Sequence, residues 1–213
     1  MGAFVNGFPA GDPTVLPTIE QLLRRYAEAL TPWAEVTAGK MLSSVNRSDE
    51  RAWAEQTQEL SRSLRLEIMR APTGNAMRGL MTEQVTLIKS IPLEAAERVH
   101  KLTLEGLENS ARAKTVSKEI QRSGEVCKSR ADLIARTEVA RTASVLTQTR
   151  AQHVGSDGYI WRTSGDPDVR HSHREMNGKF VRWASPPTLD GMKGHAGQFP
   201  NCRCYAEPVI PED

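Results

Sequence analysis

The chain has 213 residues, of which 38% are hydrophobic, 25% are charged and 5% are aromatic. This length allows one sizeable core or two small ones, and the composition excludes a disordered chain. The formal net charge of +2 is too small to indicate nucleic-acid binding, so a DNA contact would need a local basic patch. Residues 1–17 lack a basic region and a sustained apolar run, so we expect neither a signal peptide nor a membrane span.

Apolar residues recur at helical spacing through the first half of the chain. Helices are predicted from Thr18 to a break at Pro32, from Ser48, Asp49 and Glu50 to residue 70, along the stripe Met77–Ile88, and after a restart at residues 90–94. Because the predicted helices are short and their loops are short, we expect them to pack as antiparallel neighbours. The stripes indicate core and carry no chemistry.

The most polar helical stretch is residues 111–152. Ser129 and Asp132 stand at capping-box spacing, which predicts a helix from residue 130 to about 152 that ends near Gly155. Six basic residues make this stretch the best candidate for a phosphate-facing surface: Arg112, Lys114, Lys118, Arg122, Lys128 and Arg130.

Within that helix the segment "ARTEVART" places Arg136, Glu138 and Arg141 close together on the helix surface. Two interpretations stay open. The side chains can form a solvated face with ordinary ion pairs, or they can tie the helix to the C-terminal region by buried, charge-assisted hydrogen bonds.

From Gly158 onward, aromatic and branched residues alternate with turn signals. Strands are predicted at Tyr159–Thr163, Phe180–Trp183 and Cys202–Tyr205, with a turn at "SGDPD". Residues 168–176 fit either a hairpin strand or a short helix that ends at Gly178, and we favour the helix. The sequence therefore predicts an α+β protein that is mostly α: an N-terminal helical segment, then a helix with a small antiparallel sheet.

Two of the three cysteines stand in the motif "CRC", Cys202 and Cys204. A C-x-C pair closes too small a ring for an unstrained disulfide, and Cys127 is expected to be an unpaired thiol. On a strand, positions i and i+2 face the same side, so both sulfurs can face one point together with His173 and His195. Two thiolates and two imidazoles would form a tetrahedral structural zinc site.

Other interpretations of these residues remain open. The cysteines can be packing residues, with Arg203 paired to Asp168 or Glu138 and His173 bonded to a backbone carbonyl, or they can have a redox role. The acids and histidines from Asp166 to Glu175, with His171 among them, could instead form a metal-dependent nuclease or hydrolase centre. A plain DNA-binding module is a further alternative.

Four landmarks in order resemble the phage Mu F-like minor head protein family, also called the phage head morphogenesis domain. They are "IARTEVART", "WRTSGDPDVRHSH", Asn177-Gly178 and "HAGQFPNCRCYAEP". The matching residues are Arg136, Glu138, Arg141, Trp161, Asp168, Arg170, His173, Gly178, Pro200, Asn201, Cys202, Arg203 and Cys204. The resemblance spans about residues 91–207, which separates an N-terminal helical segment, 1–90, from a tail, 208–213.

The resemblance implies a structural protein of a tailed bacteriophage and no catalytic activity. Such a protein is made in the host cytoplasm and joins the virion during head morphogenesis, in the head interior or at the portal vertex. The implied partners are the portal protein, the major capsid or scaffolding protein and the packaged double-stranded DNA, with no membrane. Arg136, Glu138 and Arg141 are expected to fix the helix to the C-terminal module, with Trp161 as its hydrophobic anchor.

Overall fold

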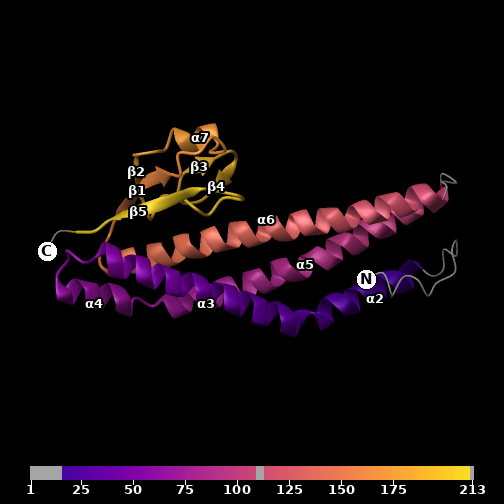
Figure 1. The fold of residues 1–213 in the computed structure, drawn as a ribbon, viewed down its shortest axis with the longest axis horizontal. Coiled ribbons are helices and arrows are strands. Elements are labelled where there is room, and N and C mark those ends of the chain that lie inside the picture. Colours follow the sequence, from indigo (N-terminus) through magenta and orange to yellow (C-terminus); the bar gives the residue numbers. More distant parts are fainter. Residues whose placement is uncertain (1–15, 109–112, 212–213) are drawn as a thin grey trace. The chain divides into compact units, whose positions relative to one another are not determined.

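The computed structural model describes residues 16–108 and 113–211 (Figure 1). Five helices come first: α2 (Leu16–Ala29), α3 (Thr31–Gln56), α4 (Arg62–Arg70), α5 (Thr73–Glu108) and α6 (Ala113–His153). Five short strands and one short helix follow: β1 (Gly158–Thr163), α7 (His171–Arg174), β2 (Phe180–Arg182), β3 (Thr188–Leu189), β4 (Met192–Lys193) and β5 (Cys204–Val209). The predicted class, α+β and mostly α, is confirmed.

The chain forms two compact units that interleave along the sequence. One unit ends at Thr37 and resumes over Gln84–Ile134, and the other comprises Ala38–Glu83 and the chain from Ala135 onward. The boundaries fall inside α3, α5 and α6, so these helices contribute to both units. The predicted boundary at residue 90 lies inside α5.

The helices are longer than the sequence predicted, and two predicted boundaries are wrong. Ser48 and Asp49 do not open a helix, because α3 runs through them and the Asp49 carboxylate is buried within the second unit. Residues 90–94 do not restart the chain, because α5 continues through a buried Pro92. Proline removes one helical hydrogen bond, a loss that packing on both sides can offset. The break near Pro32 is confirmed, since α2 ends at Ala29.

The predicted helix in the polar stretch is confirmed and extends further. It begins at Ala113 and ends at His153, two residues before Gly155, whose φ is 83°. Within the described ranges 16–108 and 113–211, no helix combines the length and the hydropathy that crossing a bilayer requires.

The main sheet has the strand order β2-β1-β5 and is antiparallel throughout. The strands predicted at 159–163 and 180–183 are confirmed as β1 and β2. The last predicted strand begins two residues late, at Cys204 opposite Thr163, and continues to Val209, past the expected end of the module. The helical prediction for residues 168–176 is confirmed by α7.

A second, two-stranded hairpin joins β3 to β4 through Asp190 and Gly191, whose φ values are 51° and 77°. Positive φ at both central residues is the type I′ turn, and Asp-Gly is its preferred sequence. The strands predicted from the sequence do not include this hairpin.

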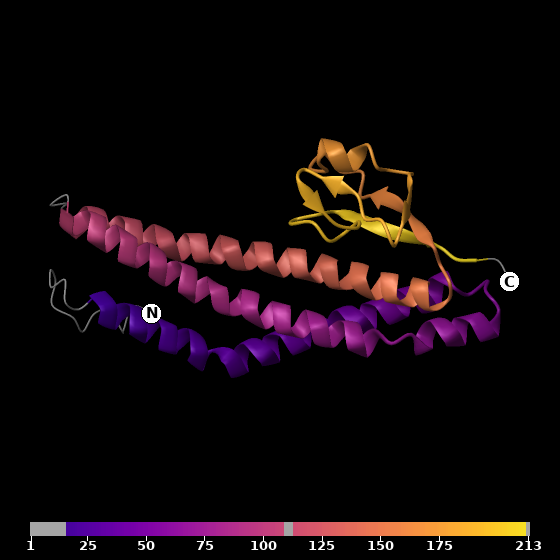
Figure 2. The same cartoon turned by 180° about the vertical axis from the view of Figure 1, so that it is seen from behind.

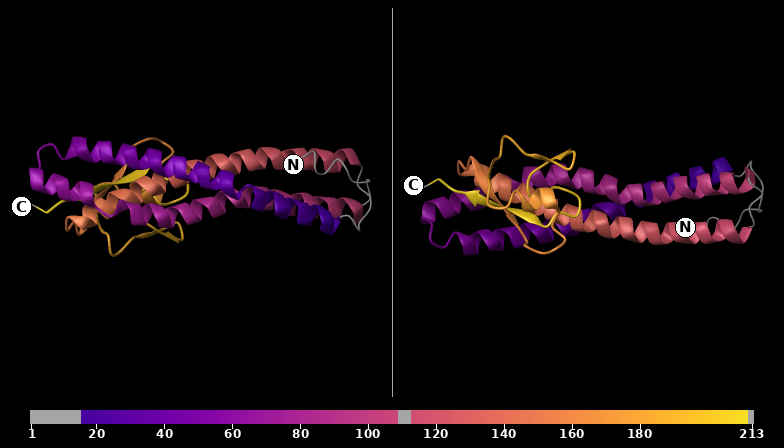
Figure 3. Two further views of the ribbon diagram at one scale, coloured as in Figure 1. Left: turned by 90° about the horizontal axis from the view of Figure 1, so that it is seen from below. Right: turned by 90° about the horizontal axis from the view of Figure 1, so that it is seen from above.

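The second unit is built around an aromatic core. Tyr159 and Trp161 of β1 are fully buried, and they cluster with Trp183, Phe199 and Ile68 of α4, among others. Figures 1 and 2 show the sheet on one side of the C-terminal part of α6 and α4 on the other, and Figure 3 shows the sheet above this part of α6. The core therefore holds the C-terminal module against the helices of its own unit.

A buried ion pair ties these helices together. Arg150 of α6 is 1% exposed, and its Nε donates to Asp49 Oδ2 of α3 at 2.7 Å. Its Nη1 donates to the carbonyl of Ile68 at 3.1 Å. The burial of Arg150 was not predicted, because a single arginine in a polar helix carries no pattern that marks it as buried.

Candidate metal centre

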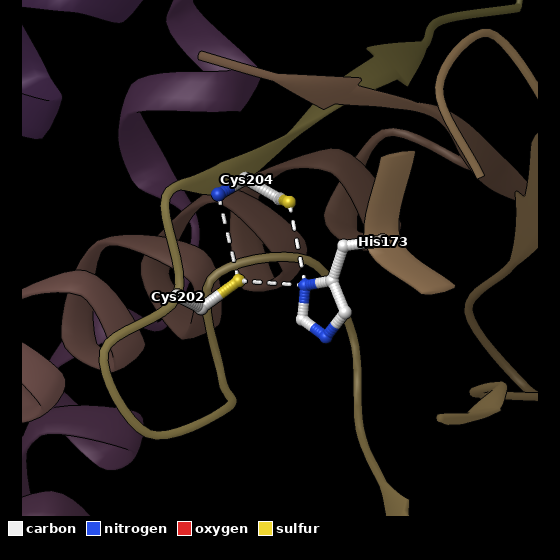
Figure 4. Close-up of side chains that lie close together, drawn as sticks. All are labelled: His173, Cys202 and Cys204. Atoms are coloured by element: carbon white, nitrogen blue, oxygen red, sulfur yellow. Dashed lines mark hydrogen bonds between the residues drawn. The ribbon is translucent and has the colours of Figure 1, made fainter. Parts of the chain in front are cut away.

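His173, Cys202 and Cys204 come together at the edge of the aromatic core (Figure 4). Each cysteine Sγ lies 3.5 Å from His173 Nδ1, and the three candidate ligand atoms lie within 4.8 Å of one another. His173 and Cys204 are buried, while Cys202 is half-buried. All three cysteines, Cys127 included, are free thiols.

A helix and a tight turn from distant parts of the chain create this arrangement. His173 lies in α7, and the turn that carries Cys202 closes with a 3.0 Å hydrogen bond from its N–H to the carbonyl of Phe199. Asn201 within the turn has a φ of 57°. The expected reason for the convergence, a shared strand face, is wrong, because only Cys204 belongs to β5.

The two thiols differ in acidity. The pKa of Cys202 falls to about 5, first because of its hydrogen bond with the Cys204 side chain, and further because of the N–H groups of Cys204 and Gly197 and the nearby His173. The Cys204 N–H lies 3.4 Å from Cys202 Sγ. The pKa of Cys204 is raised, by the same hydrogen bond first and then by burial. One thiolate beside one thiol is a ready donor set for a cation.

Aromatic rings pack around His173, and a carboxylate lies near its far nitrogen. Its ring meets those of Trp161 and Phe199 edge to face, with centroids 5.6 Å and 4.9 Å apart. Its Nε2 lies 3.9 Å from Asp190 Oδ2 on the β3–β4 hairpin. Nδ1 of His173 points toward the cysteines, and Asp190, which was not among the predicted site residues, lies near the other ring nitrogen.

His195, the fourth predicted ligand, is not brought into this group. Its Nδ1 lies 3.2 Å from the Tyr159 hydroxyl, which also accepts the Ala196 N–H at 3.1 Å. Burial lowers the pKa of His195, and a hydrogen bond with the Trp183 backbone acts in the opposite direction. The structure thus gives His195 a place in the aromatic core.

A cavity of about 240 Å³ opens beside the three residues, lined also by Asp168, Val169, Arg170, Asn201 and Arg203. Arg170 Nη2 donates to the Pro200 carbonyl at 2.8 Å, which links the start of α7 to the turn before "CRC". Arg203 pairs with Asp166 at 3.0 Å and with Asp168 at 3.1 Å. The predicted pairing of Arg203 with Asp168 is therefore present.

The acids and histidines that suggested a hydrolase centre are divided among separate contacts. Asp166 and Asp168 face Arg203, and the exposed His171 lies 3.7 Å from Glu175. Hydrogen bonds from Ser164 and then Arg203 lower the pKa of Asp166. Only His173 of this set faces the cysteines.

Gly178 and Trp161 fix the loop after α7 to β1. Gly178 has a φ of 82° and donates its N–H to the Trp161 carbonyl at 2.8 Å, while the Trp161 N–H donates to the Lys179 carbonyl at 2.9 Å. Trp161 is fully buried, as its predicted role as an anchor requires.

The segment "ARTEVART" of α6 contacts the C-terminal module through a residue that the prediction did not include. Arg141 pairs with Glu83 of α5 and lies 3.6 Å from the buried Glu138 on its own helix, and Arg136 is exposed. The Asn201 N–H instead donates to Thr137 Oγ1 at 3.0 Å. Thr137 within "ARTEVART" therefore links α6 to the turn before "CRC".

Only some of the six basic residues proposed as a phosphate-facing surface have a described environment. Arg112 lies outside the described residues. Lys128 is exposed, and Arg130 pairs with Glu94 at 3.1 Å within the first unit.

Comparison of the sequence with known proteins identifies one relative and one family. The chain is 33% identical over 131 residues to an "Uncharacterized protein" of Haemophilus influenzae Rd, an alignment that covers 62% of this chain and 29% of that protein. No solved structure matches. The family model described as phage Mu protein F-like protein matches residues 97–207, just over half of the chain.

The chain belongs to the phage Mu protein F-like family, as the landmarks predicted. The family is one of phage head morphogenesis proteins. The match contains β1 to β4, α7 and the three-residue cluster.

Proposed function

We propose that this protein is a minor structural component of a tailed-phage head that acts near the portal vertex. The family match over 97–207 carries the proposal, because it includes the whole turn that brings the "CRC" motif to α7. The partners would be the portal protein and the major capsid or scaffolding protein. The role is structural, and the ion pairs that divide Asp166, Asp168 and His171 support it over a hydrolase.

Particles of the encoding phage provide the test. Purified virions, tailless heads and free tails would be separated, and the protein would be quantified by mass spectrometry against the major capsid protein. We expect a few copies per particle in virions and tailless heads, with crosslinks to the portal protein. Recovery in free tails, or at the copy number of the major capsid protein, would contradict the proposal.

Contact with packaged DNA is the finer part of the proposal. The exposed Lys128 on α6 supports it, because a lysine on the surface can pair with a phosphate. Binding of the purified protein to duplex DNA would be measured across salt concentrations. We expect affinity to fall steeply with salt and to weaken in Lys128→Gln, whereas affinity that ignores salt and this change would remove DNA from the proposal.

A further inference from the structure

The separation of the three ligand atoms fits one metal ion. Zinc forms bonds of about 2.3 Å to sulfur and about 2.1 Å to nitrogen, which at the tetrahedral angle place the two ligand atoms about 3.6 Å apart. Both measured distances from sulfur to His173 Nδ1 are 3.5 Å. A plain packing arrangement would not require two sulfurs to meet the same ring nitrogen at the same distance.

The surroundings of the group also suit a metal. Asp190 Oδ2 stands 3.9 Å from the buried Nε2 of His173, which has no hydrogen-bond partner among the described residues. A carboxylate therefore lies on the side from which it would orient a metal-binding histidine after a small approach. Backbone N–H groups of Cys204 and Gly197 face Cys202 Sγ, where they stabilise negative charge on sulfur. Two thiolates and one imidazole would neutralise a divalent ion and favour soft metals such as zinc.

We propose that His173 Nδ1, Cys202 Sγ and Cys204 Sγ bind one zinc ion, with water in a fourth position that faces the adjoining cavity. The cavity is lined by all three residues, so solvent reaches the group from that side. The ion joins α7 to the turn before β5 and to the start of β5, and thereby links the middle of the C-terminal module to its last strand. This inference is independent of the proposed place of the protein in the phage head.

Metal content of the purified full chain is the first measurement. After reduction and zinc reconstitution, we expect about one zinc per chain, retained in Cys127→Ser and in His195→Gln and lost in His173→Gln, Cys202→Ser and Cys204→Ser. The Cys127 variant is the matched control for a cysteine change outside the group. If the His195→Gln variant did not retain zinc, the three-residue ligand set would be wrong. If the native chain bound no zinc, the site itself would be wrong.

A second measurement covers the case in which the ligand variants fail to fold. Cobalt would be titrated into the native chain, and X-ray absorption would be recorded on the zinc-loaded protein. We expect thiolate-to-cobalt absorption that saturates at one equivalent, and two sulfurs at about 2.3 Å from zinc with nitrogen or oxygen at about 2.1 Å. A shell of oxygens alone, or no thiolate band, would overturn the proposal.

Discussion

Trp161 is a fully buried member of the aromatic core of the C-terminal module. It is fully buried in the centre of β1 and touches both His173 and Phe199. We expect Trp161→Ala to lower the free energy of unfolding by about 3–5 kcal/mol, because the lost contacts leave a cavity. Denaturant titration of both proteins measures the difference. Trp161→Phe, which keeps a ring, should lose less, and equal losses in the two variants would contradict the packing argument.

Arg150 contributes to stability through a buried ion pair, so its substitution is expected to act through electrostatics. We expect Arg150→Met to cost about 3–5 kcal/mol, because Asp49 would keep a buried charge without its partner. Asp49→Leu in the same chain should recover much of that loss by removing the orphaned carboxylate. Urea titration of the two single variants and the double variant measures the coupling. Strictly additive losses would show that the two side chains do not interact.

Some residues of the candidate site could be predicted from the sequence and others could not. Trp161 is fully buried, as its predicted role as an anchor requires, and Arg203 pairs with Asp168, one of the two acids that the packing interpretation offered. His195 was misplaced, since residue type and spacing do not say which of two histidines meets the cysteines. Arg150 was not singled out, because burial of one charged side chain depends on a distant Asp49 that no local pattern connects to it.

At the scale of elements, the turn at Gly197 fixes how closely the module approaches α6. A Cβ there would lie 3.2 Å from Ser144 Cβ and 3.3 Å from the Ala140 carbonyl, and φ is 88°. Gly165 offers a matched control, because its φ is 75° and nothing lies within 4 Å of an added Cβ. The two glycines therefore separate backbone strain from crowding.

We expect Gly165→Ala to cost about 1–2 kcal/mol from the left-handed backbone alone. Gly197→Ala should cost clearly more, because the added methyl group also presses on α6. Thermal unfolding of both variants measures the difference. Equal costs at the two positions would mean that the loop moves away from α6 without loss.

The boundaries of β1 and β2 were predicted well, whereas those of β5 and of the helices were predicted poorly. Strands such as β1 are short and flanked by turn residues, so local chemistry bounds them. Proline and acid-rich caps suggested stops inside α3 and α5, yet both helices continue because packing over many turns outweighs one unfavourable residue. The dipeptide Asp190-Gly191 is a preferred sequence for a type I′ turn, so the β3–β4 hairpin could have been predicted from the sequence.

At the scale of the whole molecule, the two units differ in what they bury. The described buried side chains of the first unit include Ala27, Ala34 and Ala95, which are small. The second unit buries the aromatic core, with Trp53, Trp161 and Trp183 among its members. Since stabilisation grows with the apolar area that is buried, we expect the first unit to unfold at lower denaturant.

The tryptophans make this expectation measurable. Three of the four lie buried in the second unit, and Trp33 of the first unit is 58% exposed, so Trp33→Phe leaves fluorescence that reports the second unit alone. Far-ultraviolet circular dichroism follows helices of both units. In this variant we expect the dichroism to lose a first part of its amplitude before fluorescence changes, and to lose the rest together with it. If both signals instead change in one coincident transition, the long helices that cross the boundary couple the two units into a single cooperative fold.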